Sequence, residues 1–180
     1  FPMLEWGMNW CISNHVNNHL IIHAAVAERN GRAVILPAPP GSGKSTLCAA
    51  LVHNGWRLLS DELALVRIDN GMLVAAPRPV SLKNASIDIM RGYIPGATMS
   101  APVDATSKGT VAHLKAPADS IARSSELALP GWVIFPKYET TAAPRLAPPR
   151  RAKASLNVSR QCVNSSVMRS GGIHAAAAGR

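Results

Sequence analysis

The sequence predicts an α/β fold in which a mixed sheet that contains hairpins is flanked by helices. Two turn signals support this prediction, since Asn30-Gly31 and Asp69-Asn70-Gly71 each lie between apolar runs, as hairpin turns do. The third observation is a loop rich in glycine and proline, at 38–43, that separates a short apolar run from a helix-like segment. We therefore expect antiparallel hairpins together with at least one strand that leads directly into a helix.

The first elements surround this loop. Residues 19–27 and 32–37 predict two strands, because both runs are apolar and the second is β-branched in its centre. Residues 44–54 predict a helix with apolar side chains on one face, and Gly55 follows as a natural C-cap. The order strand, turn, strand, loop, helix is the part of the sequence in which the expected structure is clearest.

The later elements are shorter. The strands that we expect after the first helix cover 56–60, 63–68, 72–76, 109–114 and 131–135. Pro77 and Pro79 interrupt the strand pattern, and residues 84–91 are expected to form a short helix. The second half of the domain therefore adds strands to the sheet and contributes one short helix.

Charge divides the chain unevenly. It has 180 residues with 19 Lys and Arg against 10 Asp and Glu, which gives a formal net charge of +9. Residues 1–136 hold 11 basic and 9 acidic residues, whereas 137–180 hold 8 basic and one acidic residue. We divide the chain into an N-terminal segment, 1–18, a domain, 19–143, and a basic C-terminal segment of uncertain order, 144–180, rich in Pro, Ala, Ser and Gly. No series of aromatic residues interleaves with the basic ones for base stacking, so no nucleic-acid partner is expected.

Several other classes are excluded by composition. No run of 18 apolar residues exists, so we expect no membrane-spanning helix, and no stretch has the pattern of a secretory signal. The three cysteines, Cys11, Cys48 and Cys162, are widely spaced and form no CxxC motif. This spacing argues against a disulfide framework or a zinc site and is typical of a protein in the reducing cytoplasm.

The loop carries the clearest chemical motif. Residues 38–46 read Ala-Pro-Pro-Gly-Ser-Gly-Lys-Ser-Thr. The phosphate-binding loop, or Walker A motif, is G-x-x-x-x-G-K-[ST] between a strand and a helix. Gly43, Lys44 and Ser45 match this pattern, and Ala38 stands at its first glycine. Because glycine lets backbone N–H groups approach phosphates at a helix N-terminus, we predict a P-loop NTPase-type core that binds ATP and Mg²⁺.

The expected contacts to the nucleotide come from the loop and the start of the helix. The residues that we assign to them are Pro40, Gly41, Ser42, Gly43, Lys44, Ser45 and Thr46. Lys44 would place a positive charge on the outer phosphates. Ser45 would offer its hydroxyl to Mg²⁺, a hard cation that prefers oxygen ligands.

Three further residues are candidates for catalysis. Asp61 lies 17 residues after Lys44, at the end of a strand that we expect beside the loop strand. A carboxylate there can hold Mg²⁺, directly or through water, and can also accept the proton of an attacking hydroxyl. Glu62 can share this work only if the strand ends there, because adjacent strand residues point to opposite faces. His23 lies on an apolar strand, where a lone histidine is more often a packed residue.

Together these positions resemble the catalytic domain of the HPr kinase/phosphorylase superfamily, and within it the subgroup called HPr kinase-related kinase A. The positions that carry the resemblance are His23 on the strand before the loop, the loop 41–45, the stretch 54–62 that ends in the acidic pair, and the segments 81–92 and 108–114. The resemblance covers about residues 19–138. It implies a fold like that of the C-terminal domain of HPr kinase.

The same resemblance implies a function. Members of the family transfer phosphate from ATP to a serine hydroxyl on a protein, and they often form homo-oligomers. By position, Lys44 would hold the β- and γ-phosphates, Ser45 and Asp61 would bind Mg²⁺, and Asp61 would also be the base. His23 would lie beside the transferred phosphate, and Glu62 stands where the family commonly has a second Asp.

Other possibilities stay open. The downstream signature of the bifunctional members is reduced here to Arg91-Gly92 with Asp88 before it, so the sequence does not support phosphorylase activity and does not decide whether it exists. A nucleotide-binding regulatory module without phosphotransfer is one alternative. A small-molecule kinase is another, although we identify no lid with clustered arginines. The sequence does not name the protein that would accept the phosphate.

Overall fold

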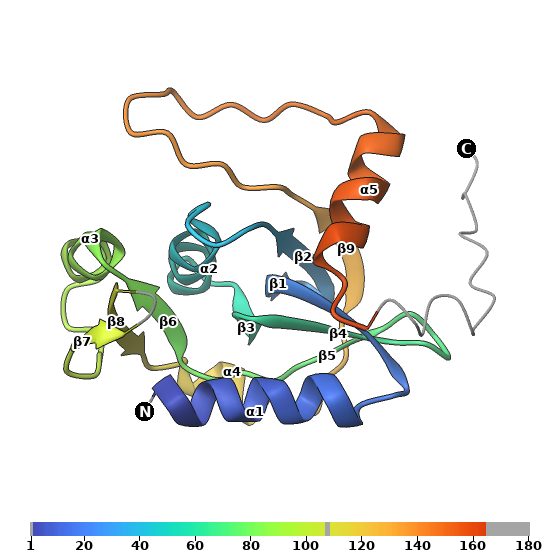
Figure 1. The fold of residues 1–180 in the computed structure, drawn as a ribbon, viewed down its shortest axis with the longest axis horizontal. Coiled ribbons are helices and arrows are strands. Elements are labelled where there is room, and N and C mark those ends of the chain that lie inside the picture. Colours follow the sequence, from blue (N-terminus) through green and yellow to red (C-terminus); the bar gives the residue numbers. More distant parts are fainter. Residues whose placement is uncertain (1, 107–108, 165–180) are drawn as a thin grey trace.

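The computed structural model describes residues 2–106 and 109–164 (Figure 1). Its fold is a mixed α/β arrangement in which a mixed sheet is flanked by helices, as the sequence predicts. Within the described residues the main sheet has six strands, which are β1 (His19–Arg29), β2 (Arg32–Pro37), β3 (Arg57–Ser60), β4 (Leu63–Arg67), β5 (Leu73–Val74) and β9 (Leu129–Val133). Their order is β5-β4-β1-β2-β9, and β3 also pairs with β1.

The pairing in the main sheet explains why it is mixed. β1 and β2 form an antiparallel hairpin, while β2 pairs in parallel with β9. The hairpin turns at Asn30 and Gly31, whose φ angles of 54° and 76° are both in the left-handed region. Such angles at both central residues are what a tight hairpin turn of this kind requires, so the turn predicted from Asn-Gly is confirmed.

A second, antiparallel sheet lies on the far side of α2. Its strands, in the order β6-β8-β7, are β6 (Val80–Lys83), β8 (Gly109–Leu114) and β7 (Val103–Thr106). The helices are α1 (Pro2–His15), α2 (Lys44–His53), α3 (Ala85–Tyr93), α4 (Ala118–Ala122) and α5 (Arg151–Gln161). Figure 1 shows α2 between the main sheet and the β6–β8 sheet, which places the start of α2 near both.

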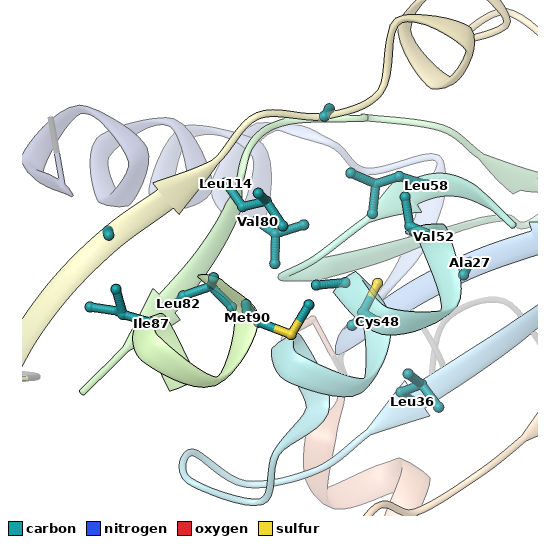
Figure 2. Close-up of a cluster of buried hydrophobic side chains, with 14 of the residues drawn as sticks. Ala27, Leu36, Cys48, Val52, Leu58, Val80, Leu82, Ile87, Met90 and Leu114 are labelled. Carbon is teal, nitrogen blue, oxygen red and sulfur yellow. The ribbon is translucent and has the colours of Figure 1, made fainter. Parts of the chain in front are cut away.

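The largest apolar cluster fills this space. Figure 2 shows Cys48 and Val52 of α2 between Ala27 of β1 and side chains of β6, with Met90 of α3 beside them. The other face of β1 belongs to a second cluster, against which Val158 of α5 is packed. A smaller third cluster on the α2 side of the sheet is covered by α1. Helices therefore cover both faces of the main sheet.

Several predicted elements are confirmed and others differ. The strands at 19–27 and 32–37 and the helices at 44–54 and 84–91 are present, with ends that differ by a few residues. The strand expected at 72–76 is only Leu73–Val74, and the last strand is Leu129–Val133 instead of 131–135. The sequence did not indicate α1, β6, β7 or α4. For α1 the reason is that its sequence is apolar almost all round and has no amphipathic period.

The position of β3 is a correction. The sequence placed this strand beside β2, but β3 pairs with β1, which lies between them. The physical reason is the length of β1, since its eleven residues pair with β4 in the first half and with both β2 and β3 in the second.

The C-terminal part returns to β1. After α5, the backbone N–H of Val163 donates to the carbonyl oxygen of Ile21 at 2.9 Å. The side chain of Asn164 bonds to both the Ile21 N–H and the His19 carbonyl. Of the segment 144–180 whose order the sequence left open, residues 165–180 lie outside the described residues.

Candidate functional site

The predicted phosphate-binding loop connects β2 to α2, which begins at Lys44. Gly41 and Gly43 have φ angles of 82° and 86°, a backbone conformation that favours glycine. Among the described residues no side chain caps the start of α2, and the first intrahelical bond runs from Leu47 N–H to the Gly43 carbonyl at 2.9 Å. The earlier N–H groups of this helix start are therefore suited to an anion.

Polar side chains of this loop are buried. Lys44 is a buried residue, and its positive charge acts on the carboxyl of Asp61. The Ser42 hydroxyl is also buried, and within residues 2–106 and 109–164 it has no hydrogen-bond partner. Because a buried polar atom without a partner costs free energy, its hydroxyl is a group that a ligand could satisfy.

Asp61 follows the last residue of β3 and is only 4% exposed. Its Oδ2 accepts a hydrogen bond from the Ser81 backbone N–H at 3.0 Å, whereas Oδ1 is buried and has no partner among the described residues. Burial and the charge of Glu62 raise the pKa of Asp61 to about 6. The Ser81 N–H, the Ser45 side chain and the Lys44 charge act in the opposite direction and favour the carboxylate.

The acidic pair lies in the break between β3 and β4, two strands that both pair with β1. β3 and β4 lie on the same side of β1, and the Ala24 N–H between them donates to the Glu62 carbonyl at 3.1 Å. Ala25, the next residue of β1, packs in the same cluster as α2. Ser45 and Lys44 at the start of α2 both act on the Asp61 carboxyl, so Asp61 reaches this helix although β1 separates β3 from β2.

Glu62 lies between the side chains of His23 and Lys83. Its Oε2 is 3.5 Å from His23 Nδ1, and its Oε1 is 3.6 Å from Lys83 Nζ. Glu62 itself is buried, whereas the side chains of His23 and Lys83 are 30% and 27% exposed. β3 ends before Asp61, so adjacent strand residues no longer have to point to opposite faces and both acids can belong to one site. This is the condition under which we expected Glu62 to share the work of Asp61.

The structure thus brings together most of the predicted site. Lys44, Ser45, Asp61, Glu62 and His23 are linked by the contacts and charge effects above. The loop positions Pro40, Gly41 and Gly43 follow β2, and Thr46 lies half-buried in the first turn of α2. No described contact links Pro40 or Thr46 to the acidic pair.

Sequence reasoning missed two neighbours of the site. Lys83 stands on β6, 21 residues after Glu62, within the segment 81–92 that shares in the family resemblance, but the sequence assigned no role to Lys83 itself. Tyr138 passes beside the loop, because a Cβ on Gly43 would lie 3.3 Å from the Tyr138 Cβ. Neither residue has a motif of its own, since each reaches the site only through the tertiary fold.

The metal-binding capacity of the site is limited. Within the described residues no group of three or more His, Cys, Asp or Glu side chains could hold a metal ion. Asp61 and Ser45 fit Mg²⁺, which is commonly held by one or two protein ligands together with phosphates and water. The partnerless Oδ1 of Asp61 is the observation that favours this fit.

A cavity of about 320 Å³ lies elsewhere, at the hairpin end of β1. Glu28 and Arg57 line it, and their ion pair is closed, with Arg57 Nε 2.6 Å from Glu28 Oε2. Arg57 also donates to the carbonyl oxygens of Arg123 and Glu126. These charges satisfy one another, so we assign them a structural role.

The comparisons bear on the family to which the chain belongs. No helix within the described residues is long and apolar enough to cross a membrane. No curated protein and no solved structure matches the chain. Residues 3–95 match the family described as SynChlorMet cassette protein ScmC, and this segment includes α1, the loop, the acidic pair and Lys83. Since the match covers more than half of its residues, the chain belongs to the ScmC family of SynChlorMet cassette proteins.

Proposed function

We propose that this protein is an ATP-dependent kinase with a P-loop core, and that its acceptor is a serine hydroxyl on a protein. The observation that carries the proposal is the proximity of the glycine loop and Lys44 to the buried carboxyl of Asp61, to which a second acid is coupled. The resemblance of these positions to the HPr kinase superfamily supports a protein serine as the acceptor. The family match to ScmC neither names an activity nor conflicts with this one.

On the nucleotide side, the proposal assigns the phosphates to the start of α2. The N–H groups of this helix start and the helix dipole favour negative charge, and Lys44 adds a full positive charge. Lys44 is buried, so its charge is less screened by solvent than that of a surface lysine. This arrangement supports binding of the outer phosphates of a nucleoside triphosphate.

On the metal side, we assign Asp61 and Ser45 to Mg²⁺. When bound, Mg²⁺ would supply positive charge that stabilises the phosphates during transfer. With a pKa of about 6, the Asp61 carboxyl is roughly nine-tenths ionised at pH 7 and can serve as a ligand. Its Oδ2 is held by the Ser81 N–H, which leaves Oδ1 for the ion.

The experiment is transfer from ATP labelled at the γ-phosphate. Wild-type protein is incubated with Mg²⁺, labelled ATP and a lysate of the source cell, and the products are separated into proteins and small molecules. We expect label on a protein and its loss in Lys44→Ala. Lys137→Ala is the matched control, because Lys137 is exposed and pairs with Glu139, and this variant should label normally.

The outcomes separate the alternatives. Label on a small molecule would make the protein a small-molecule kinase. ATP binding by calorimetry without any labelled product would make it a nucleotide-binding regulatory module. No ATP binding by the wild type, or full labelling by Lys44→Ala, contradicts the proposal itself.

A further inference from the structure

We infer that His23, oriented by Glu62, is the general base that takes the proton of the acceptor hydroxyl, and that Lys83 is a positioning residue for Glu62. The inference rests on the proposed function and identifies the proton acceptor at that same site. It differs from the expectation drawn from the family resemblance, which gives the base to Asp61.

The position of Asp61 does not suit a base for an incoming protein. A base must come within about 2.6–3.2 Å of the hydroxyl, or reach it through one water, when the substrate is bound. Asp61 is 4% exposed, its Oδ2 is occupied by the Ser81 N–H, and Oδ1 is buried. Because the proposed function assigns Oδ1 to Mg²⁺, neither oxygen of this carboxyl is left to take the proton of a serine hydroxyl.

His23 offers what Asp61 lacks. Its side chain is 30% exposed, and it lies on β1 beside Glu62. Nδ1 faces Glu62 Oε2 at 3.5 Å, so a proton on Nδ1 points at the carboxylate and Nε2 keeps a lone pair. A carboxylate that fixes the tautomer of a histidine in this way makes the second nitrogen a base. The separation is longer than a hydrogen bond, and such contacts often tighten when the substrate is bound.

Lys83 completes the arrangement. Glu62 is a buried carboxylate whose two oxygens face different partners, Oε2 toward the His23 imidazole and Oε1 toward Lys83 Nζ at 3.6 Å. A carboxylate held at both oxygens cannot rotate away from the imidazole without losing one contact. Lys83 therefore acts on the reaction through Glu62, which makes it a positioning residue.

The transfer step balances as follows. The O–H bond of the acceptor breaks and its proton moves to Nε2 of His23, while the acceptor oxygen forms a bond to the γ-phosphorus. The bond from the γ-phosphorus to the bridging oxygen breaks, and its electron pair leaves with ADP. The imidazolium then releases its proton to solvent. If water replaces the acceptor, the same step gives inorganic phosphate.

Hydrolysis of ATP therefore tests the role of His23 even though the acceptor protein is not known. Release of inorganic phosphate from Mg²⁺-ATP is measured beside ATP binding by calorimetry. We expect His23→Ala to lower phosphate release by about 10²–10⁴-fold with unchanged ATP affinity, and added imidazole to restore part of the rate. His19→Ala is the matched control, since His19 lies four residues earlier on β1 and its ring contacts Asn18. It should keep the wild-type rate.

Positioning is tested separately. Glu62→Gln and Lys83→Met should each lower kcat while ATP affinity stays unchanged, and Lys83→Arg should retain more activity than Lys83→Met. Asp61→Asn should behave differently and weaken the Mg²⁺-dependent part of ATP binding.

Several results would overturn the inference. The first is a wild-type rate of phosphate release by His23→Ala. The second is that imidazole restores the rate of neither His23→Ala nor His23→Asn. The third is that Asp61→Asn stops hydrolysis while Mg²⁺-dependent ATP binding stays intact. The second histidine variant covers a folding defect of the first. If the wild type does not bind ATP, the proposed function fails as well, and this result is distinct from the other three.

Discussion

A buried glutamate with basic partners lies at each half of β1, Glu28 on the strand itself and Glu62 beside His23, but the distances to the partners differ. In the hairpin half, Glu28 and Arg57 lie 2.6 Å apart, and both side chains are 2% exposed. In the half nearer the loop, Glu62 lies 3.5 Å from His23 and 3.6 Å from Lys83, and both partners reach solvent. The closed pair is shielded from solvent, whereas the His23 and Lys83 side chains of the open cluster are 30% and 27% exposed. The difference separates charges that hold the fold from charges that are available for chemistry.

The largest effect should follow from breaking the closed pair. Arg57→Met leaves the buried carboxylate of Glu28 without its main partner and also removes the bonds to the Arg123 and Glu126 carbonyls. An unpaired buried charge of this kind costs about 3–5 kcal/mol. We expect the free energy of unfolding, measured by urea denaturation, to fall by that amount.

The control for this prediction is a double variant. Glu28→Leu with Arg57→Met removes both charges and should recover part of the stability, because a buried pair replaced by apolar groups is often nearly neutral. Equal stability of Arg57→Met and wild type would mean that the closed pair does not have the structural role that we assign to it.

Replacement of Asp61 should raise the free energy of unfolding, whereas Arg57→Met should lower it. Its pKa is raised to about 6 by burial and by Glu62, above the ordinary value of 3.8. Between about pH 4 and pH 6 the Asp61 carboxyl then binds more protons in the folded state than in the unfolded state, so its contribution to stability is greatest below pH 4 and is lost as pH rises through 6. Asp61→Asn should abolish this loss and stabilise the free protein at pH 7 by about 3 kcal/mol.

Urea denaturation across pH 4–8, without nucleotide or Mg²⁺, measures this effect. Asp69→Asn is the control, since Asp69 is exposed and the guanidinium of Arg67 lowers its pKa. That variant should keep the pH dependence of the wild type. A difference in stability between wild type and Asp61→Asn that stays constant from pH 4 to pH 6 would contradict the raised pKa of Asp61.

How far the sequence predicts these regions depends on the range of the interactions. The Asn30-Gly31 turn and the loop before Lys44 were predicted correctly, because backbone conformation at glycine and asparagine is a local property. The position of β3 was wrong, because nothing local shows that β1 is long enough to separate β3 from β2. Of the open cluster, His23 and Glu62 were candidates from the sequence, whereas Lys83 was found only through the fold. Spacing along the chain does not show that β6 places the ammonium group of Lys83 beside Glu62.

The smallest effect on stability should come from Lys83, and it sharpens the contrast between the two halves of β1. Lys83 is partly exposed and lies 3.6 Å from Glu62, so solvent screens their attraction. Lys83→Met should change the free energy of unfolding by less than about 1 kcal/mol, several times less than Arg57→Met. Urea denaturation of the two variants under one condition makes the comparison. A loss as large as that of Arg57→Met would show that the open cluster also holds the fold together. A small loss combined with a fall in phosphate release would instead separate the role of Lys83 in the reaction from any role in stability.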